Sequence, residues 1–150
     1  MAPDGPLRLR AEDADDLAVI SAVVQDALIS VKDLSYDRAG RRFTLVANRF
    51  RWETKGNGAD GEAAYERTVC AVTFDDVQGV SYRGFRRRDE DRILSLLAIR
   101  PKETPGAIDL EFSGGATLRL AISTINIYAT DLGEAWPTVW EPDHNTGDAP

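Results

Sequence analysis

The stretch AIDLEFSGGATLRLAI, residues 107–122, decides the fold class because it holds two alternating segments around a pair of glycines. Residues 107–112 alternate apolar and charged side chains, and residues 117–122 alternate back. A period of two is typical of a strand with one buried face, and Gly114-Gly115 favours a hairpin turn. The stretch therefore predicts an antiparallel β-hairpin.

Strand patterns continue upstream of this hairpin. They fall in residues 7–10, 31–37, 42–53, 66–74, 80–85 and 92–100, although the apolar content of residues 92–100 also fits a buried helix. In the long segment 42–53 the odd spacing of Phe43 and Phe50 would put them on opposite faces of a regular strand. We therefore expect a bulge near Asn48. Short turns between these segments predict an antiparallel sheet of about seven strands.

Helical patterns occur near both ends of the chain. Apolar residues at helical spacing predict a helix over residues 14–28, with Asp13 as its N-cap. Residues 123–132 fit either a strand or a short helix that stops at Gly133, and we favour the helix. The expected class is α+β: a sheet, an N-terminal helix and a possible short C-terminal helix. A strongly bent seven-strand sheet plugged by a C-terminal helix is the plan of a pleckstrin-homology-like barrel, so we consider that architecture for this chain.

Length and charge bound the organisation and the partners. The 150 residues suit one domain, which we place at residues 1–144, followed by a flexible tail at 145–150. No apolar run reaches the roughly 20 residues of a membrane span, and the first residues lack a signal-peptide pattern, so we expect a cytoplasmic protein. The net charge of −7 disfavours nucleic acid and anionic membranes as partners.

Few side chains offer reactive chemistry. The chain has one cysteine, Cys70, and one histidine, His144, which excludes an intramolecular disulfide and zinc sites built on several cysteines. Cys70 lies on an apolar strand face, as a buried structural thiol would. Residues 56–61 match G-x-G-x-x-G but lack the following helix that a dinucleotide site needs. We therefore assign no catalytic residue, no cofactor and no metal ligand.

Two segments are candidates for an interaction surface. Arg86, Arg87 and Arg88 lie next to Tyr82 and Phe85, where they could hold a phosphate or stack on RNA bases; the alternative is a solvated turn paired with the acidic residues 89–91. The second segment carries Trp136 and Trp140, which either cover the domain's own core or dock a partner.

Four blocks of sequence point to a family. They are DLAVIS with QDA (16–21 and 25–27), RF with NRFRWE (42–43 and 48–53), RRRDEDRILSLLAI (86–99) and DLGEAWPT (131–138). With these blocks the chain resembles domain-of-unknown-function family 2948 over most of residues 10–144. The resemblance implies a small bacterial cytoplasmic protein. It implies no activity and no catalytic residue.

Three hypotheses about function follow. The leading one is a non-catalytic binding or scaffold domain that acts through contact with an unknown protein partner, and a homo-oligomer stays open. The alternative is binding of RNA or a phosphorylated ligand through the Arg86–Arg88 loop. The third is a small-molecule enzyme whose site is assembled from distant residues.

Overall fold

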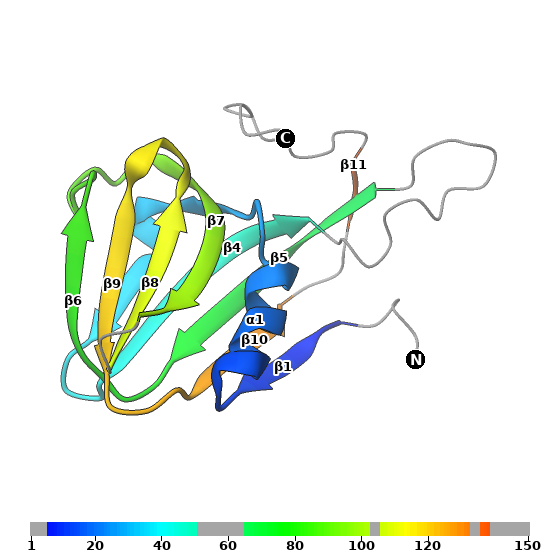
Figure 1. Cartoon of the computed structure of the whole chain (residues 1–150). Helices are drawn as coiled ribbons and strands as arrows, with labels where there is room; N and C mark the ends of the chain where they lie inside the picture. Colours follow the sequence, from blue (N-terminus) through cyan, green and yellow to red (C-terminus); the bar gives the residue numbers. More distant parts are fainter. Residues whose placement is uncertain (1–5, 51–64, 103–105, 133–135, 139–150) are drawn as a thin grey trace.

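A computed structural model describes residues 6–50, 65–102, 106–132 and 136–138. The described part contains one α-helix, two 3-10 turns and eleven strands (Figure 1). The helix α1 spans Ala14–Val23, and the turns η1 and η4 span Val31–Asp33 and Ser113–Gly115. The strands are β1 (Arg8–Ala11), β2 (Leu28–Ser30), β3 (Leu34–Asp37), β4 (Arg42–Phe50), β5 (Tyr65–Phe74), β6 (Val77–Arg83), β7 (Ile93–Pro101), β8 (Ala107–Phe112), β9 (Thr117–Ile122), β10 (Ile127–Asp131) and β11 (Trp136–Thr138).

The strands form one antiparallel network. Its order is β1-β10-β5-β4-β2-β7-β8-β9-β6, with β11 beside β5 and β3 beside β4. The network bends at β2, so that β6, β9, β8 and β7 form a layer in front of β4 and β5 (Figure 1). Apolar side chains from both layers make one buried cluster between them. This burial is the main stabilising term of the fold.

The expected α+β class with about seven strands is wrong: the protein is mostly antiparallel sheet. The expected pleckstrin-homology-like barrel is not found either, because β1 and β6 end the described strand order without pairing with each other. The miscount has a local cause. Residues 31–37 divide into η1 and β3, and β2, β10 and β11 were not expected as strands.

The N-terminal helix begins where its cap predicts and ends early. The Asp13 side chain accepts a hydrogen bond from the Asp16 amide at 2.8 Å, which supports the expected N-cap. The helix ends at Val23 rather than at residue 28. Asp26 has a left-handed φ of 66°, and its amide donates to Leu96 O on β7 at 2.7 Å. Pairing with the sheet therefore replaces the last helical turn.

Residues 127–131 form strand β10, so the helix favoured for residues 123–132 is wrong. β10 lies between β1 and β5, where Ile127 and Ala129 are buried. The β-branched residues of this segment suit a strand, and the two neighbouring strands satisfy its backbone on both sides. Pairing with β1 and β5 thus outweighs the helical spacing of apolar residues in this short segment.

Strand β4 is regular, and the bulge expected near Asn48 is absent from it. Its register with β5 runs without a shift from Phe43 opposite Phe74 to Phe50 opposite Arg67. Phe43 and Phe50 do lie on opposite faces, and both are fully buried. The expected bulge assumed that only one face of the strand is buried, whereas buried aromatic side chains lie on both faces of β4.

The hairpin of residues 107–122 is confirmed. β8 and β9 pair with Leu110 opposite Leu118 and Asp109 opposite Arg119. Gly114 and Gly115 take φ values of 77° and 83° in the turn, a conformation that disfavours other residues. The leucines point into the core, so Asp109 and Arg119 lie on the outer face of the front layer. Within the described residues, no helix is long and apolar enough to cross a membrane.

Candidate functional site

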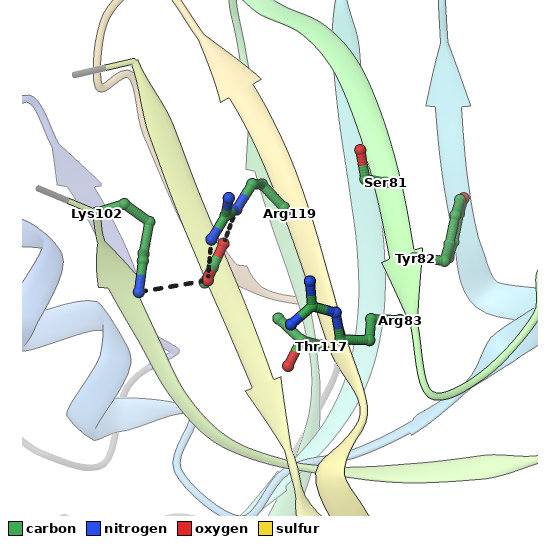
Figure 2. Close-up of a pocket in the computed structure, with 7 residues that line it drawn as sticks. Ser81, Tyr82, Arg83, Lys102, Thr117 and Arg119 are labelled. Atoms are coloured by element: carbon green, nitrogen blue, oxygen red, sulfur yellow. Dashed lines mark hydrogen bonds and ion pairs between the residues drawn. The ribbon is translucent and has the colours of Figure 1, made fainter. Parts of the chain in front are cut away.

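A polar groove lies on the outer face of the front layer. Its volume is about 400 Å³, and Figure 2 shows the side chains that line it. They come from β6, β9 and β8 and from the residue after β7: Ser81, Tyr82, Arg83, Lys102, Asp109, Thr117 and Arg119. Three are cationic and one is acidic. The groove is therefore locally basic on a chain whose net charge is −7.

The register of β6 and β9 sets the arrangement of the groove. Ser81 lies opposite Arg119, and Arg83 lies opposite Thr117. Partners across an antiparallel pair share a face, so the two arginines occupy one diagonal and the two hydroxyls the other. Long side chains on such a diagonal, about 7–8 Å apart at Cα, can reach a common ligand. The groove thus presents guanidinium and hydroxyl donors together.

Asp109 fixes the orientation of Arg119. The Arg119 Nε donates to Oδ1 of Asp109 at 2.7 Å, and its Nη2 donates to Oδ2 at 3.1 Å. The Lys102 Nζ lies 3.7 Å from the same Oδ2 (Figure 2). Asp109 is only 5% exposed, whereas the Arg119 side chain is 51% exposed. The buried carboxylate therefore holds the guanidinium by its Nε–Nη2 edge, and Nη1 takes no part in this pair.

Arg83 supplies a cation that no carboxylate neutralises within the described residues. Its side chain is exposed, and it takes part in none of the ion pairs among them. Figure 2 shows Arg83 reaching toward Thr117 across β9. An oxyanion in the groove would meet the free edge of Arg119 and the whole guanidinium of Arg83. Both can donate two parallel hydrogen bonds to one carboxylate or phosphate.

The Asp109 carboxylate gives a pH-dependent prediction. The hydrogen bonds from Arg119 lower the pKa of Asp109 against the opposing effect of burial. A lowered pKa stabilises the folded state above the unfolded-state value of about 3.9, and that contribution is lost as pH falls through the folded-state pKa. We expect Asp109→Asn to be less stable than the wild type at neutral pH, and this difference to shrink as pH falls below about 3.9.

Urea unfolding from neutral to acidic pH measures this difference. Glu111→Gln is the matched control, because Glu111 pairs with Arg100 on the same face but both side chains are more exposed, at 35% and 63%. Its effect should be small at every pH. A stability difference between Asp109→Asn and wild type that stays constant with pH would contradict the prediction.

The arginine loop lies at one end of the groove. The side chains of this loop that carry charge are exposed between β6 and β7: Arg86, Arg87 and Arg88. Burial raises the pKa of the neighbouring Tyr82, and the positive charge of Arg87 partly lowers it again. The ion pairs with the acidic residues 89–91 that the solvated-turn alternative predicts are not seen, since these guanidiniums form no ion pair with any described residue. Asp89 instead accepts a hydrogen bond from the Arg86 amide at 3.0 Å.

The structure does not bring the tryptophan segment to the arginine loop. Trp136 begins β11, whose backbone pairs with β5, and Trp136 lies opposite Arg67. The arginine loop follows β6, at the other end of the strand order, and Figure 1 shows the two segments at different ends of the molecule. Trp140, His144 and the G-x-G-x-x-G match at residues 56–61 lie outside the described residues.

Cys70 is buried, as expected of a structural thiol. It is 1% exposed on β5, and burial raises the pKa of its thiol to about 12. Its cross-strand neighbour Asp131 binds Arg49 in a buried ion pair, and the nearby carboxylate also raises the pKa of Cys70. A thiol with such a pKa is not a nucleophile at neutral pH, because the thiolate is the reactive species.

Sequence reasoning missed six of the residues that line the groove: Ser81, Arg83, Lys102, Asp109, Thr117 and Arg119. One usable signal was present: the alternation of residues 107–112 and 117–122 puts Asp109 and Arg119 on the same outer face of a hairpin. No local pattern joins that face to Arg83, which lies 36 positions before Arg119 in the chain. Their meeting depends on the pairing of β6 with β9.

Comparison with known proteins places the chain in a family. No curated protein and no solved structure matches it significantly. A family model described as "Protein of unknown function (DUF2948)" matches residues 7–144, which is most of the chain. The resemblance noted in the four sequence blocks is thereby confirmed, and the chain belongs to the DUF2948 family.

Proposed function

We propose that this protein is a non-catalytic cytoplasmic binding domain that holds an anionic group of a partner in the basic groove. One observation carries the proposal: Asp109 fixes Arg119 by one edge while Arg83, without an ion pair among the described residues, faces the same groove. In this proposal residues 1–144 act as one domain and residues 145–150 as a tail.

Charge supports this function. A surface of a protein with net charge −7 is acidic on average, so a cluster of three cations around one buried acid stands out as a local attraction for anions. The hydroxyls of Ser81 and Thr117 add neutral donors between the cations. The groove offers donors and positive charge but no group placed as a base or nucleophile, which fits binding rather than chemistry.

The test is a titration with inorganic pyrophosphate at low salt, in which NMR monitors the chemical shifts of the backbone amides and arginine side chains. We expect shifts to concentrate on residues 81–83, 102 and 117–119. Arg83→Glu should weaken binding about tenfold to a hundredfold, because a charge-assisted hydrogen bond contributes about 1.5–3 kcal/mol. Arg119→Lys should weaken it less, since it keeps the charge but loses the fork.

Arg88→Glu is the matched control, with the same charge change on the exposed loop outside the groove lining. It should bind pyrophosphate nearly as well as the wild type. Equal losses in Arg83→Glu and Arg88→Glu would show a diffuse charge effect and contradict the groove. Shifts confined to residues 86–88 would contradict it as well.

A second candidate function is binding of RNA or a phosphorylated ligand through Arg86, Arg87 and Arg88. The observation that favours it is the absence of ion pairs for these three guanidiniums among the described residues, which leaves them available for phosphate. Phe85 does not take part, because it is 6% exposed. Under this function the triple change to glutamate abolishes binding, and wild-type affinity falls steeply with salt.

A further inference from the structure

The strands β1 and β6 are the two end strands of the strand order, and β6 is the longer of them. It has seven residues, whereas β1 at the other end has four. The β3–β4 region covers only its start: the Tyr36 hydroxyl donates to Val77 O at 2.8 Å, and the Val77 amide donates to Arg41 O at 2.8 Å. Beyond that point, within the described residues, the backbone of β6 pairs only with β9.

An edge strand directs alternate backbone donors and acceptors away from its neighbour, where another strand can bind them. Proteins usually protect such an edge with bulges, prolines or charges. β6 has a register shift between Val77 and Gly79, at the end that is already covered. From Val80 to Arg83 the register with β9 is regular, so this part of the edge can accept an extended chain.

The two faces of β6 define what would fit beside it. Val80 and Tyr82 are half-buried and pack against the core cluster. Ser81 and Arg83 are exposed on the other face and line the basic groove. An added strand would therefore cover apolar side chains on one face and meet cationic and hydroxyl groups on the other.

We propose that the partner is an extended peptide with alternating acidic and apolar residues, which adds to the free edge of β6 as a further strand. Its carboxylates would lie beside Ser81 and Arg83, with Arg119 behind them, and its apolar residues would extend the cover over Val80 and Tyr82. Opposite charges across a strand pair are stabilising, and the backbone bonds supply affinity. The inference rests on the proposed function, since the groove supplies the charge that selects an acidic strand.

The test uses the full chain and two synthetic peptides of equal composition. One alternates glutamate with valine, and the other groups all glutamates at one end, so it has the same charge without an acidic face. We expect the alternating peptide to bind at least about tenfold more tightly and to protect amides of β6 from hydrogen exchange. Equal affinities, or no protection of β6, would overturn strand addition, whereas groove binding of pyrophosphate would still stand.

A charge-swap variant tests whether Arg83 contacts the acidic residues of the peptide. Arg83→Glu should lose the glutamate peptide and gain affinity for a peptide that alternates lysine with valine, while Arg88→Glu should keep the preference for glutamate. Circular dichroism checks that each variant is folded. An unchanged preference in Arg83→Glu would overturn the proposal. Dimerisation of the free protein in sedimentation, with the β6 amides protected from hydrogen exchange, would also overturn the proposal, because a second copy would then occupy the edge. Failure of both pyrophosphate and peptide to bind would reject the proposed function too.

Discussion

Replacing Asp131 with alanine is expected to destabilise the protein by about 3–5 kcal/mol, because it leaves the buried guanidinium of Arg49 without its carboxylate. The Arg49 side chain is 0% exposed and that of Asp131 is 3% exposed. Arg49 Nε and Nη2 donate to the two carboxylate oxygens of Asp131, each at 2.8 Å. Oδ2 of Asp131 also accepts from the Leu7 amide at 2.9 Å, so the pair connects β4 and β10 to the residue that precedes β1.

Urea unfolding of Asp131→Ala measures this loss, and two variants control it. Asp75→Ala removes the partner of Arg42, whose side chain is 58% exposed, so its cost should stay below about 1 kcal/mol. The double variant Arg49→Met with Asp131→Asn removes both charges and keeps an acceptor for the Leu7 amide. It should regain most of the loss. A cost for Asp131→Ala as small as that of Asp75→Ala would contradict a buried, mutually dependent pair.

The second large effect is expected for Phe85→Ala, which should destabilise the protein by about 3–5 kcal/mol. Phe85 makes edge contacts with Tyr82, at 5.3 Å between ring centroids, and with Phe112, at 5.9 Å. It thereby anchors the start of the arginine loop to the core. Gly84 beside it has a φ of 82°, and a Cβ there would lie 2.9 Å from Ala116 Cα. Directly after Arg83 the chain therefore passes so close to Ala116 that a residue with a Cβ would clash there.

Thermal or urea unfolding of Phe85→Ala gives the stability loss, and pyrophosphate titration of the folded fraction gives its effect on the groove. Phe85→Leu keeps most of the buried volume and should cost less than about 1.5 kcal/mol. We expect Phe85→Ala to weaken pyrophosphate binding as well, because the end of β6 loses its anchor. A stable Phe85→Ala variant would show that the ring does not belong to the core.

Local patterns recovered much of the secondary structure. The cap at Asp13, the hairpin around Gly114-Gly115 and the buried face of β5 follow from spacing and turn chemistry within a few residues. The end of α1 and the strand β10 did not follow. In each case a pairing with a distant strand, β7 for Asp26 and β5 for Ile127, competes with the local preference and wins.

The sequence predicted only part of the candidate site. Arg86, Arg87 and Arg88 stand out as a cluster in the sequence and were considered for phosphate binding, whereas Arg83, three positions earlier, was not named as a site residue. Asp109 and Arg119 looked like an ordinary solvent face of a hairpin. Only the pairing of β6 with β9 places Arg83 beside them, and only burial of Asp109 makes Arg119 a fixed donor.

The sequence by itself determined the β-rich hairpin pattern, the family and the scarcity of nucleophilic side chains, because these depend on residue identity and on a period of two along the strand. The tertiary structure alone decided the strand order, the burial of Arg49 with Asp131 across 82 positions, and the joining of three cations in one groove. The physical reason is that alternation specifies which face of a strand is buried, whereas the identity of its neighbours is decided by packing between residues far apart in the chain.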